Sequence, residues 1–375
     1  MVRPTRKSTL IGWLVWVPNV LLPKRDDRAI LYGHPPLNDG VLAVLDGLRE
    51  RGIECDIIVD DPRTAELVRD EAMQRGVRRI LQRHALATML AYARSRYVFI
   101  TSALYRSRPV GRQRLVNLWH GAFTKRIDAR PVFAGLRGVR TTASSRLGAA
   151  YRAFEFNVAP KDIMLIGSPR NDRLLGADRV DSRARLGLDP EGLILLWLPT
   201  FREDGLERVH PPSPSGPDLD ALEPWLSAHN ARLVIKHHPF APPTPASAHR
   251  HVIVLPHDGS PPSLADLMAA SDGLITDHSS AWADYLLLDR PIWIHWPDVA
   301  RWTDIDDLPL TPLDRWLPGP LTTSLPDLIH ELSRHFDDND DAWAERREWL
   351  GAVFHQFHDT ESTSRLLDAL GIVSD

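Results

Sequence analysis

The sequence predicts an α/β fold with two domains, each built around a parallel β-sheet. The chain has 375 residues and a hydrophobic content of 43%, which is enough for two hydrophobic cores. Short runs of apolar, β-favouring residues alternate with stretches of helical spacing, and this pattern is typical of βαβ units. The runs form two series, separated by a polar stretch at 172–189 that we interpret as the boundary between the domains.

The first series begins with a buried strand at 29–33, which ends at a glycine followed by two prolines. Helical spacing follows at 41–51, and the apolar run at 55–59 predicts the next strand. Two further strands are expected at 97–101 and 114–119.

The second series begins near residue 192 and repeats the alternation. Its turn-rich loops are long, and long loops at a sheet edge often carry function. We expect strands at 193–198, 232–235, 251–255 and 273–276, helices at 219–229, 264–270 and 281–288, and loops at 204–218 and 240–247.

Four segments are therefore expected along the chain. An apolar and basic N-terminal segment (1–25) precedes the first domain (26–180). The second domain (190–340) is followed by C-terminal helices (341–375), for which we expect a course back to the first domain.

The N-terminal segment contains an apolar run of about 13 residues between Leu10 and Leu22, shorter than the ~20 that span a bilayer. Pro18 also interrupts it. Its tryptophans and flanking cations favour a segment that lies at a membrane interface. A buried first helix is the alternative.

Charge is divided unevenly between the two halves of the chain. Residues 1–180 contain 31 Lys and Arg against 17 Asp and Glu, although the whole chain has a net charge of −4. This asymmetry predicts an anionic partner for the first half: a membrane surface, a polyphosphate or nucleic acid. A solvated arginine-rich surface is the alternative. The single cysteine, Cys55, excludes a disulfide framework and a cysteine-rich metal site, and suits a reducing cytosol.

Five short polar motifs each end an apolar run. Because the loops after parallel strands meet at one crevice, we expect these motifs to lie together there. Their histidines, arginine and hydroxyl groups suit a substrate that carries phosphate. The motifs are Asn117-Leu118-Trp119-His120-Gly121, Gly167-Ser168-Pro169-Arg170-Asn171-Asp172, Pro199-Thr200-Phe201-Arg202-Glu203, Lys236-His237-His238-Pro239 and Thr276-Asp277-His278-Ser279-Ser280.

His120 is the candidate proton acceptor, since a histidine can take a proton near neutral pH and the glycine after it lets a ligand come close. A structural or merely exposed histidine is the alternative in a chain with 16 of them. Lys236 and His238 can supply charge and a hydrogen bond to a phosphate oxygen. A zinc site is not expected there, because adjacent histidines lack the usual spacing and no cysteine assists.

Ser279 and Ser280 precede a predicted helix, where free amides and the helix dipole attract anions. Plain N-capping is the alternative. Arg202 can bind phosphate bidentately or simply pair with a neighbouring glutamate. Arg170 and Asn171 belong to a turn that either lines the crevice or acts as a hinge. Motifs of dinucleotide binding, P-loops, nucleophile elbows and helical zinc sites are missing from the sequence.

Taken in order, the motifs resemble those of the CDP-glycerol:poly(glycerophosphate) glycerophosphotransferase family of wall teichoic acid and capsule synthesis. The resemblance runs from about residue 29 to 335. The family more often has Tyr where His278 stands and Trp where Phe201 stands. Besides the five motifs, the resemblance includes Lys125, Asp284-Tyr285 and Leu317-Pro318-Gly319-Pro320.

The resemblance implies a GT-B architecture, with two Rossmann-like domains facing across a cleft. It implies a transferase that moves a polyol phosphate, with glycerol phosphate the first candidate, from a CDP-polyol to an acceptor hydroxyl and releases CMP. No cofactor and no metal are expected. His120 and His238 are the expected catalytic residues, and the donor phosphates are expected to be held by Arg202, Lys236, Asp277, Ser279, Ser280, Arg170 and Asn171.

The implied partners are a CDP-polyol such as CDP-glycerol, an anionic lipid-linked polymer acceptor and the cytoplasmic face of the cell membrane, where the protein would be peripheral. Nucleic acid is not expected as a partner. A GT-B glycosyltransferase that uses a nucleotide sugar is the alternative enzyme. A third hypothesis is a non-catalytic basic module that binds nucleic acid through residues 72–127, although that region has no recognition motif.

Overall fold

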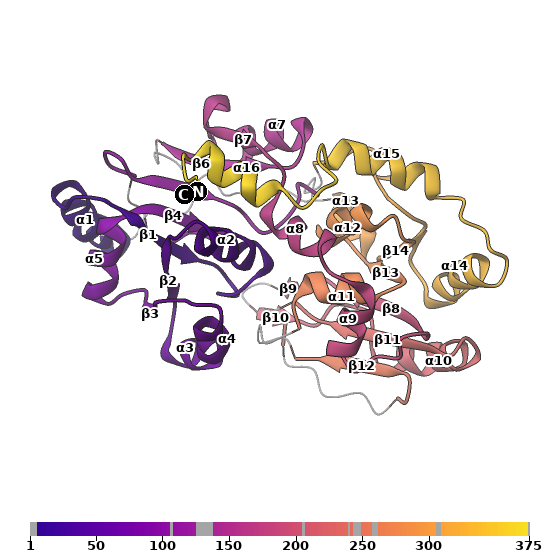
Figure 1. The fold of residues 1–375 in the computed structure, drawn as a ribbon. Coiled ribbons are helices and arrows are strands. Elements are labelled where there is room, and N and C mark those ends of the chain that lie inside the picture. Colours follow the sequence, from indigo (N-terminus) through magenta and orange to yellow (C-terminus); the bar gives the residue numbers. More distant parts are fainter. Residues whose placement is uncertain are drawn as a thin grey trace. The chain divides into compact units, whose positions relative to one another are not determined.

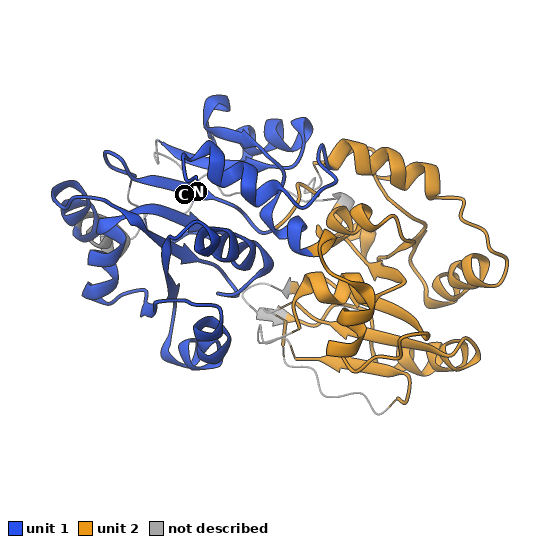
Figure 2. Ribbon diagram, in the orientation of Figure 1, with its two compact units in different colours: residues 1–120, 127–173, 355–375 blue, residues 121–126, 174–354 orange. Residues whose placement is uncertain are grey.

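The computed structural model describes residues 6–105, 108–124, 138–204, 207–238, 241–242, 249–256, 262–304 and 309–373 (Figure 1). Lys125, Pro239 and most of the loop expected at 240–247 lie outside these residues. The chain divides into two compact units (Figure 2). Unit 1 contains residues 1–120, 127–173 and 355–375, and unit 2 contains residues 121–126 and 174–354.

The division between the units differs in three places from the segments expected from the sequence. Residues 121–126, expected in the first domain, belong to unit 2. Residues 174–180 belong to unit 2, because α9 (Arg179–Arg185) packs on α11 (Leu264–Ala270) and buries Arg183 against Asp272. The stretch 341–375 is not one segment. Its first helix, α15 (Ala344–Phe354), packs within unit 2, whereas α16 (Ser362–Ala369) packs on α2 (Asp39–Glu50) in unit 1.

Unit 1 is built on a seven-stranded parallel sheet with the order β3-β2-β1-β4-β5-β6-β7. The order reverses direction between β1 and β4, as in Rossmann-like sheets. The strands are β1 (Arg25–Tyr32), β2 (Glu54–Val59), β3 (Arg79–Gln82), β4 (Ser95–Ile100), β5 (Arg114–Asn117), β6 (Val139–Ala143) and β7 (Ile163–Leu165).

Helices cover both faces of this sheet, so its central strands are apolar on both sides. Ala29 and Leu31 of β1 point into a core shared with α2 and α16. Ile30 and Tyr32, which alternate with them, point into a second core that includes residues of α5 (Leu86–Arg94) and Phe156. The other helices of this part of the chain are α3 (Pro62–Leu67), α4 (Arg69–Gln74), α7 (Arg146–Glu155), η1 (Pro160–Asp162) and α8 (Pro169–Leu175).

The N-terminal helix α1 (Arg6–Leu21) packs on α5. Val15 and Asn19 are buried there, and the Lys24 ammonium donates to the carbonyl oxygens of Asn19 and Ala93. None of the described helices combines the length and hydrophobicity that a membrane span requires. Large apolar side chains nevertheless lie exposed on α1: Leu14, Trp16, Val17, Val20 and Leu21.

Unit 2 is built on a six-stranded parallel sheet with the order β12-β11-β8-β13-β14-β15. One face packs on α10 (Gly216–Ala228) and α14 (Leu325–Phe336), with Trp197 and Trp293 in the core between them. The strands are β8 (Leu193–Leu198), β11 (Ala231–Lys236), β12 (Val252–Leu255), β13 (Gly273–Thr276), β14 (Ile292–His295) and β15 (Leu321–Thr322).

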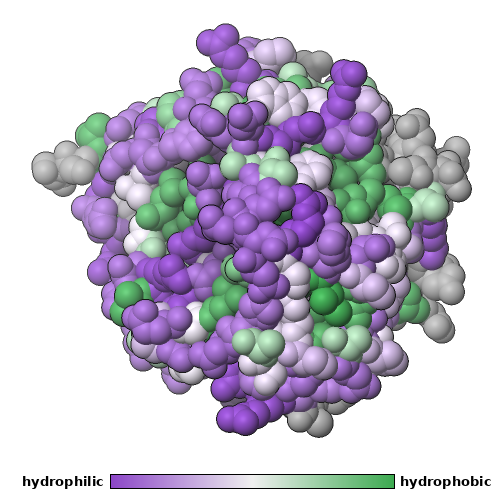
Figure 3. All heavy atoms as spheres, turned by 90° about the vertical axis from the view of Figure 1, so that its right-hand side faces the viewer, coloured by the Kyte–Doolittle hydropathy of each residue, from purple (hydrophilic) through white to green (hydrophobic). Residues whose placement is uncertain are grey.

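β9 (Arg202–Asp204) and β10 (Glu207–Val209) form a separate antiparallel pair, and β10 lies in the stretch expected as a loop. On the face of the molecule that carries α10 and α14, hydrophilic residues predominate and hydrophobic ones form separate patches (Figure 3). The remaining elements are α12 (Ala281–Tyr285), η2 (Leu286–Leu288), α13 (Val299–Asp304) and η3 (Leu313–Arg315). The predicted α/β class with two parallel sheets is confirmed.

Candidate functional site

Polar residues gather at the carboxyl ends of the strands in each unit. When the strands of unit 2 are numbered from β8, the sheet order reads 3-2-1-4-5-6. Sheets of this order bind ligands outside the carboxyl ends of the first and fourth strands, where the strand order reverses. Those strands are β8 and β13, which lead directly into the motifs at 199–203 and 276–280. In unit 1 the corresponding pair is β1 and β4, and β5, which leads to His120, lies next to β4.

His120 lies just after the end of β5, and contacts with Thr101 and Trp119 orient its ring. Its Nδ1 lies 2.7 Å from the carbonyl oxygen of Thr101, at the end of β4. A carbonyl can only accept, so Nδ1 carries the hydrogen and Nε2 of the neutral ring is the atom that can take up a proton. The ring also stacks on Trp119, with centroids 4.3 Å apart. This exposed, oriented imidazole suits a general base.

Trp119, the residue before it, has a left-handed backbone with φ of 58°. That conformation costs a bulky residue about 1–2 kcal/mol. The indole is buried against Phe156, with the guanidinium of Arg152 5.8 Å from the ring. Strained backbone of this kind occurs often at active sites, where the surrounding structure maintains it.

The turn at 167–172 anchors the C-terminal helix of unit 1. The Asp172 carboxylate accepts hydrogen bonds from the backbone amides of Ser362 and Thr363, at the start of α16. Asn171 is buried, and its side-chain nitrogen lies 3.4 Å from Nδ1 of His355. Arg170 is half-buried and lies beside Gly40 of α2. Sequence reasoning expected the turn to line the crevice or act as a hinge and did not detect this anchoring.

In unit 2 the structure brings Arg202 and Asp277 together beyond the carboxyl ends of the paired strands β8 and β13. Both side chains are buried, and Nη2 of Arg202 lies 2.9 Å from the Asp277 carboxylate. Asp277 also accepts hydrogen bonds from the backbone amide and the hydroxyl of Thr200, the latter at 2.6 Å. Asp277 therefore joins the two loops that follow the central strands.

Arg202 is shared between two carboxylates. Asp298, after β14, accepts from both Nε and Nη2 at 2.9 Å, and the carbonyl oxygen of Thr200 accepts from Nη1 at 2.6 Å. The sequence predicts that Arg202 holds the donor phosphates, and it indicates no role for Asp298 or, within the motif at 199–203, for Thr200. The only sequence signal for Asp298 is its place just after a short apolar run at 292–296.

The charges of this cluster reinforce each other. Burial alone would raise the pKa of Asp277, but the charges of His278 and Arg202 and the hydrogen bonds from Thr200 outweigh it and lower that pKa. Burial likewise opposes ionisation of Asp298, and its bonds to Arg202 lower the pKa of that carboxyl. Burial works against the Arg202 cation too, yet Asp298 and Asp277 raise the Arg202 pKa. All three groups are therefore charged at neutral pH.

His278 is buried among aromatic rings rather than directed to the surface. It stacks on Trp296 with centroids 5.0 Å apart and contacts Trp302 of α13 at 4.0 Å. The guanidinium of Arg202 lies 5.4 Å from the Trp302 ring. An aromatic wall of this kind fits the place where the family more often has a tyrosine.

Ser279 and Ser280 are half-buried and directly precede α12. The Ser279 hydroxyl accepts a hydrogen bond from the backbone amide of Ala281 at 3.3 Å, and Ser280, the N-cap residue, makes no side-chain capping bond. Capping therefore involves Ser279. Both hydroxyls remain next to Asp277 in sequence, at the carboxyl edge of the sheet.

Lys236 is the last residue of β11, the strand beside β8, and His238 lies just after that strand. The His238 ring lies against Phe201, with centroids 4.6 Å apart. The Lys236 ammonium lies 3.4 Å from the carbonyl oxygen of Pro256, after β12. His238, Phe201, Arg202 and Asp277 thus share one edge of the unit 2 sheet, while His120, Arg170 and Asn171 belong to unit 1.

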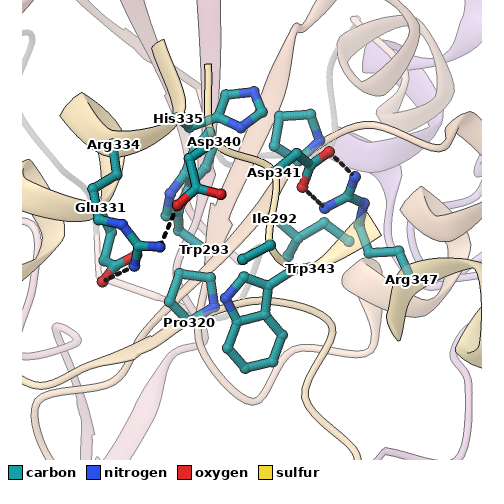
Figure 4. A pocket seen from close by; sticks show the side chains of 12 residues that line it. Ile292, Trp293, Pro320, Glu331, Arg334, His335, Asp340, Asp341, Trp343 and Arg347 are labelled. Atoms are coloured by element: carbon teal, nitrogen blue, oxygen red, sulfur yellow. Dashed lines mark hydrogen bonds and ion pairs between the residues drawn. The ribbon is translucent and has the colours of Figure 1, made fainter. Parts of the chain in front are cut away.

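A pocket in unit 2 lies at the other end of the strands, near the amino ends of β14 and β15 (Figure 4). It has an empty volume of about 300 Å³, open to solvent, and none of the predicted site residues lines it. Its charged groups already pair with one another: Arg334 with Glu331 and Asp340, and Arg347 with Asp341. Within the described ranges, no group of three or more His, Cys, Asp or Glu side chains is placed to hold a metal ion.

Comparisons with solved structures identify the fold. Wall Teichoic Acid Polymerase TagF matches with a TM-score of 0.75 and 17% identity, over 98% of this chain and 92% of that one. A TagF variant soaked with CDPG matches with a TM-score of 0.76 at the same identity, again over 98% and 92%. The fold is therefore of the GT-B-like class.

Sequence comparisons identify relatives of which about half the length matches this chain. Teichoic acid ribitol-phosphate primase of Bacillus spizizenii is 31% identical over 224 residues, 57% of this chain and 54% of the relative. The ribitol-phosphate polymerase TarK of Staphylococcus aureus is 23% identical over 295 residues, 73% of this chain and 56% of the relative. The chain spans about half the length of the curated relatives it matches.

A family model described as CDP-Glycerol:Poly(glycerophosphate) glycerophosphotransferase matches residues 59–371. The match includes every candidate site residue described above, from His120 to Ser280. With most of its length covered, the chain belongs to the CDP-glycerol:poly(glycerophosphate) glycerophosphotransferase family.

Proposed function

We propose that this chain transfers a polyol phosphate from a CDP-polyol to the hydroxyl of an anionic lipid-linked or polymeric acceptor and releases CMP. Glycerol phosphate is the first candidate for the transferred group. The observation that carries the proposal is the orientation of His120, whose Nδ1 faces the Thr101 carbonyl oxygen at 2.7 Å. That tautomer makes Nε2 the proton acceptor.

In the proposed step, Nε2 of His120 takes the proton of the acceptor hydroxyl. The hydroxyl oxygen then forms a bond to the phosphorus that carries the polyol, and the bond from that phosphorus to the bridging oxygen of the diphosphate breaks. CMP leaves with the bonding electron pair. Phosphoryl transfer depends mainly on positioning and charge stabilisation, so a base and a cationic cradle suffice.

The carboxyl edge of unit 2 is the proposed cradle for the donor diphosphate. His238, Ser279 and Ser280 supply donors from the loops after β11 and β13, which flank β8, and Lys236 supplies a donor from the last residue of β11. The contacts of Arg202 with Asp277 and Asp298 support a more specific role, in which Arg202 orders these loops and contributes charge. Arg170 and Asn171 are proposed to act from unit 1.

CMP release tests the reaction. Purified protein, a lipid-linked glycerol phosphate primer and a panel of CDP-glycerol, CDP-ribitol and UDP-sugars would be mixed and the nucleotide product quantified. We expect CMP from a CDP-polyol and no turnover with UDP-sugars. Release of UDP instead would favour the alternative glycosyltransferase, and inactivity with every CDP-polyol would refute the proposal.

His120→Ala tests the base. We expect turnover to fall by at least 10²-fold, within the range that general base catalysis contributes. Donor affinity, measured by calorimetry, should stay within twofold. His84→Ala, a change at an exposed histidine of the same unit, is the matched control. Loss of donor binding in His120→Ala would contradict the assignment.

The exposed apolar side chains of α1 and α5 support the further proposal that the protein binds the cytoplasmic face of the membrane peripherally. Leu86 and Leu90 on α5 are exposed, as are Trp16 and four aliphatic side chains on the adjacent α1. A cluster of this kind marks an interaction surface, and a basic first half suits anionic lipid.

Sedimentation with vesicles tests the membrane proposal. We expect Leu21→Asp to reduce co-sedimentation with vesicles of anionic lipid at least fivefold. Leu67→Asp changes another exposed leucine of unit 1 and should have no effect. Equal sedimentation of the two variants would refute a membrane role for this face.

A further inference from the structure

The turn that leads to His120 is held by hydrogen bonds from buried side chains. The Asn117 side-chain oxygen accepts the backbone amide hydrogen of Trp119 at 3.0 Å. This bond closes a three-residue turn over Leu118, the kind of local bond that asparagine favours. Asn117 is almost completely buried, with 1% exposure, so its side chain has no competing water.

Two hydroxyls of the neighbouring strand β6 complete the support. Thr141 donates to the Asn117 carbonyl oxygen at 3.0 Å, and Thr142 donates to the Leu118 carbonyl oxygen at 3.2 Å. The Leu118 amide bonds to the Ile100 carbonyl oxygen on the other side. Asn117 is the last residue of β5, so these bonds fix the backbone at the point where the chain leaves the sheet.

The result of the turn is the direction of the imidazole. With Trp119 left-handed, the indole enters the core near Phe156 and the next residue faces the end of β4. There His120 meets the Thr101 carbonyl oxygen, and the Thr101 hydroxyl is itself held by Asn38 at 3.1 Å. In an ordinary extended backbone at position 119 the chain would continue along β5 instead.

We propose that Asn117 is a positioning residue for His120: its side-chain bond to the Trp119 amide maintains the left-handed turn that sets the direction and tautomer of the imidazole. The proposal rests on the proposed role of His120 as the base. Asn117 touches neither substrate in this proposal and acts only through the turn. Small displacements of a catalytic group cost large factors in rate, about 10²-fold for 1 Å.

Asn117→Ala and Asn117→Asp test the proposal as a pair. Alanine removes the acceptor, and we expect kcat to fall 10- to 100-fold while the KM for the CDP-polyol stays within twofold. Aspartate keeps an acceptor at the same place and should restore kcat to within fivefold of the wild type. A kcat that is equally low in both variants, or a loss confined to KM, would overturn the proposal.

The tautomer of His120 gives a readout that does not depend on activity. In ¹⁵N-labelled protein, the signal of His120 is assigned by its loss in His120→Gln. We expect Nδ1–H in the wild type and in Asn117→Asp, and a mixture of tautomers in Asn117→Ala. An unchanged tautomer in Asn117→Ala would overturn the proposal even if activity fell.

Two further variants separate positioning from stability. Thr142→Val is nearly isosteric and removes only the bond to Leu118, so this variant should fold even if Asn117→Ala does not. We expect it to lower kcat about threefold. Asn230→Ala changes an asparagine of unit 2 that itself has a left-handed backbone, and it should leave kcat unchanged. If His120→Ala keeps its activity, the proposed role of His120 as the base fails, while the tautomer measurement still decides whether Asn117 orients the ring.

Discussion

Replacing Asp277 by Asn should destabilise unit 2 more than any other single isosteric change at its carboxyl edge. The carboxylate accepts two bonds from Thr200 and one from Arg202 while only 4% exposed. An asparagine keeps one acceptor oxygen and turns an NH₂ group toward the other donors. Removing one partner of a buried ion pair costs about 3–5 kcal/mol. Because Asp298 still neutralises Arg202, we expect the lower limit, about 3 kcal/mol.

Thermal and urea unfolding measure this loss. Nine of the twelve tryptophans lie between residues 174 and 354, so tryptophan fluorescence reports mainly on unit 2. A loss of about 3 kcal/mol should lower the Tm of a unit of this size by roughly 6–12 °C. Circular dichroism of the native variant should match the wild type, since the sheet itself is unchanged.

Asp298→Asn is the matched control. Its carboxylate bonds to the same guanidinium but is 23% exposed, and water can replace part of what is lost. We expect a smaller loss of about 1.5–2 kcal/mol, the lower part of the range for hydrogen bonds to charged groups. A Tm of Asp277→Asn equal to that of Asp298→Asn, or within 1 °C of the wild type, would refute the idea that Asp277 joins the two central loops.

Three other predictions follow from described contacts. Acid should destabilise unit 2, because the pKa values of Asp277 and Asp298 are lower in the folded than in the unfolded protein. The stability that these carboxylates contribute is complete above about pH 4, their pKa in the unfolded chain, and is lost as the pH falls through their folded pKa values. A free energy of unfolding that stays constant down to pH 2 would contradict this. Asp172→Ala should cost about 1–2 kcal/mol, as loss of a helix cap does, and should speed hydrogen exchange at the first amides of α16; unchanged exchange there would contradict the anchoring. Cys55 should resist thiol reagents in the native protein at pH 8, because it is buried and burial raises the pKa of its thiol to about 12; labelling as fast as in urea would be inconsistent with that.

The central strands of both sheets could be predicted because they are buried on both faces and appear as continuous apolar runs. Leu193–Leu198 and Gly273–Thr276 are examples. The sequence does not mark β6 (VRTTA) or β15, which has two residues, because these strands are short or polar and derive their structure from their neighbours. Tertiary pairing decides such segments more than local preference does.

At the candidate site, the residue types could be predicted but their partners could not. Arg202 and Asp277 were both expected near phosphate, yet they are 75 positions apart, and only the sheet order brings them within 2.9 Å. Asp298 has no motif of its own. The roles of Asn117 and Asp172 depend on backbone conformation at Trp119 and on the return of α16, and neither is encoded in a short pattern.

The return of α16 to unit 1 makes that unit discontinuous in the chain. One of its two cores includes Leu366, Leu367 and Leu370, which the ribosome adds only after all of unit 2. During synthesis the first sheet therefore remains without part of its cover until the last residues emerge, while unit 2 can already form its own core. Expression of residues 1–173 alone should yield an aggregation-prone product, and a soluble first unit needs residues 355–373 joined back to it.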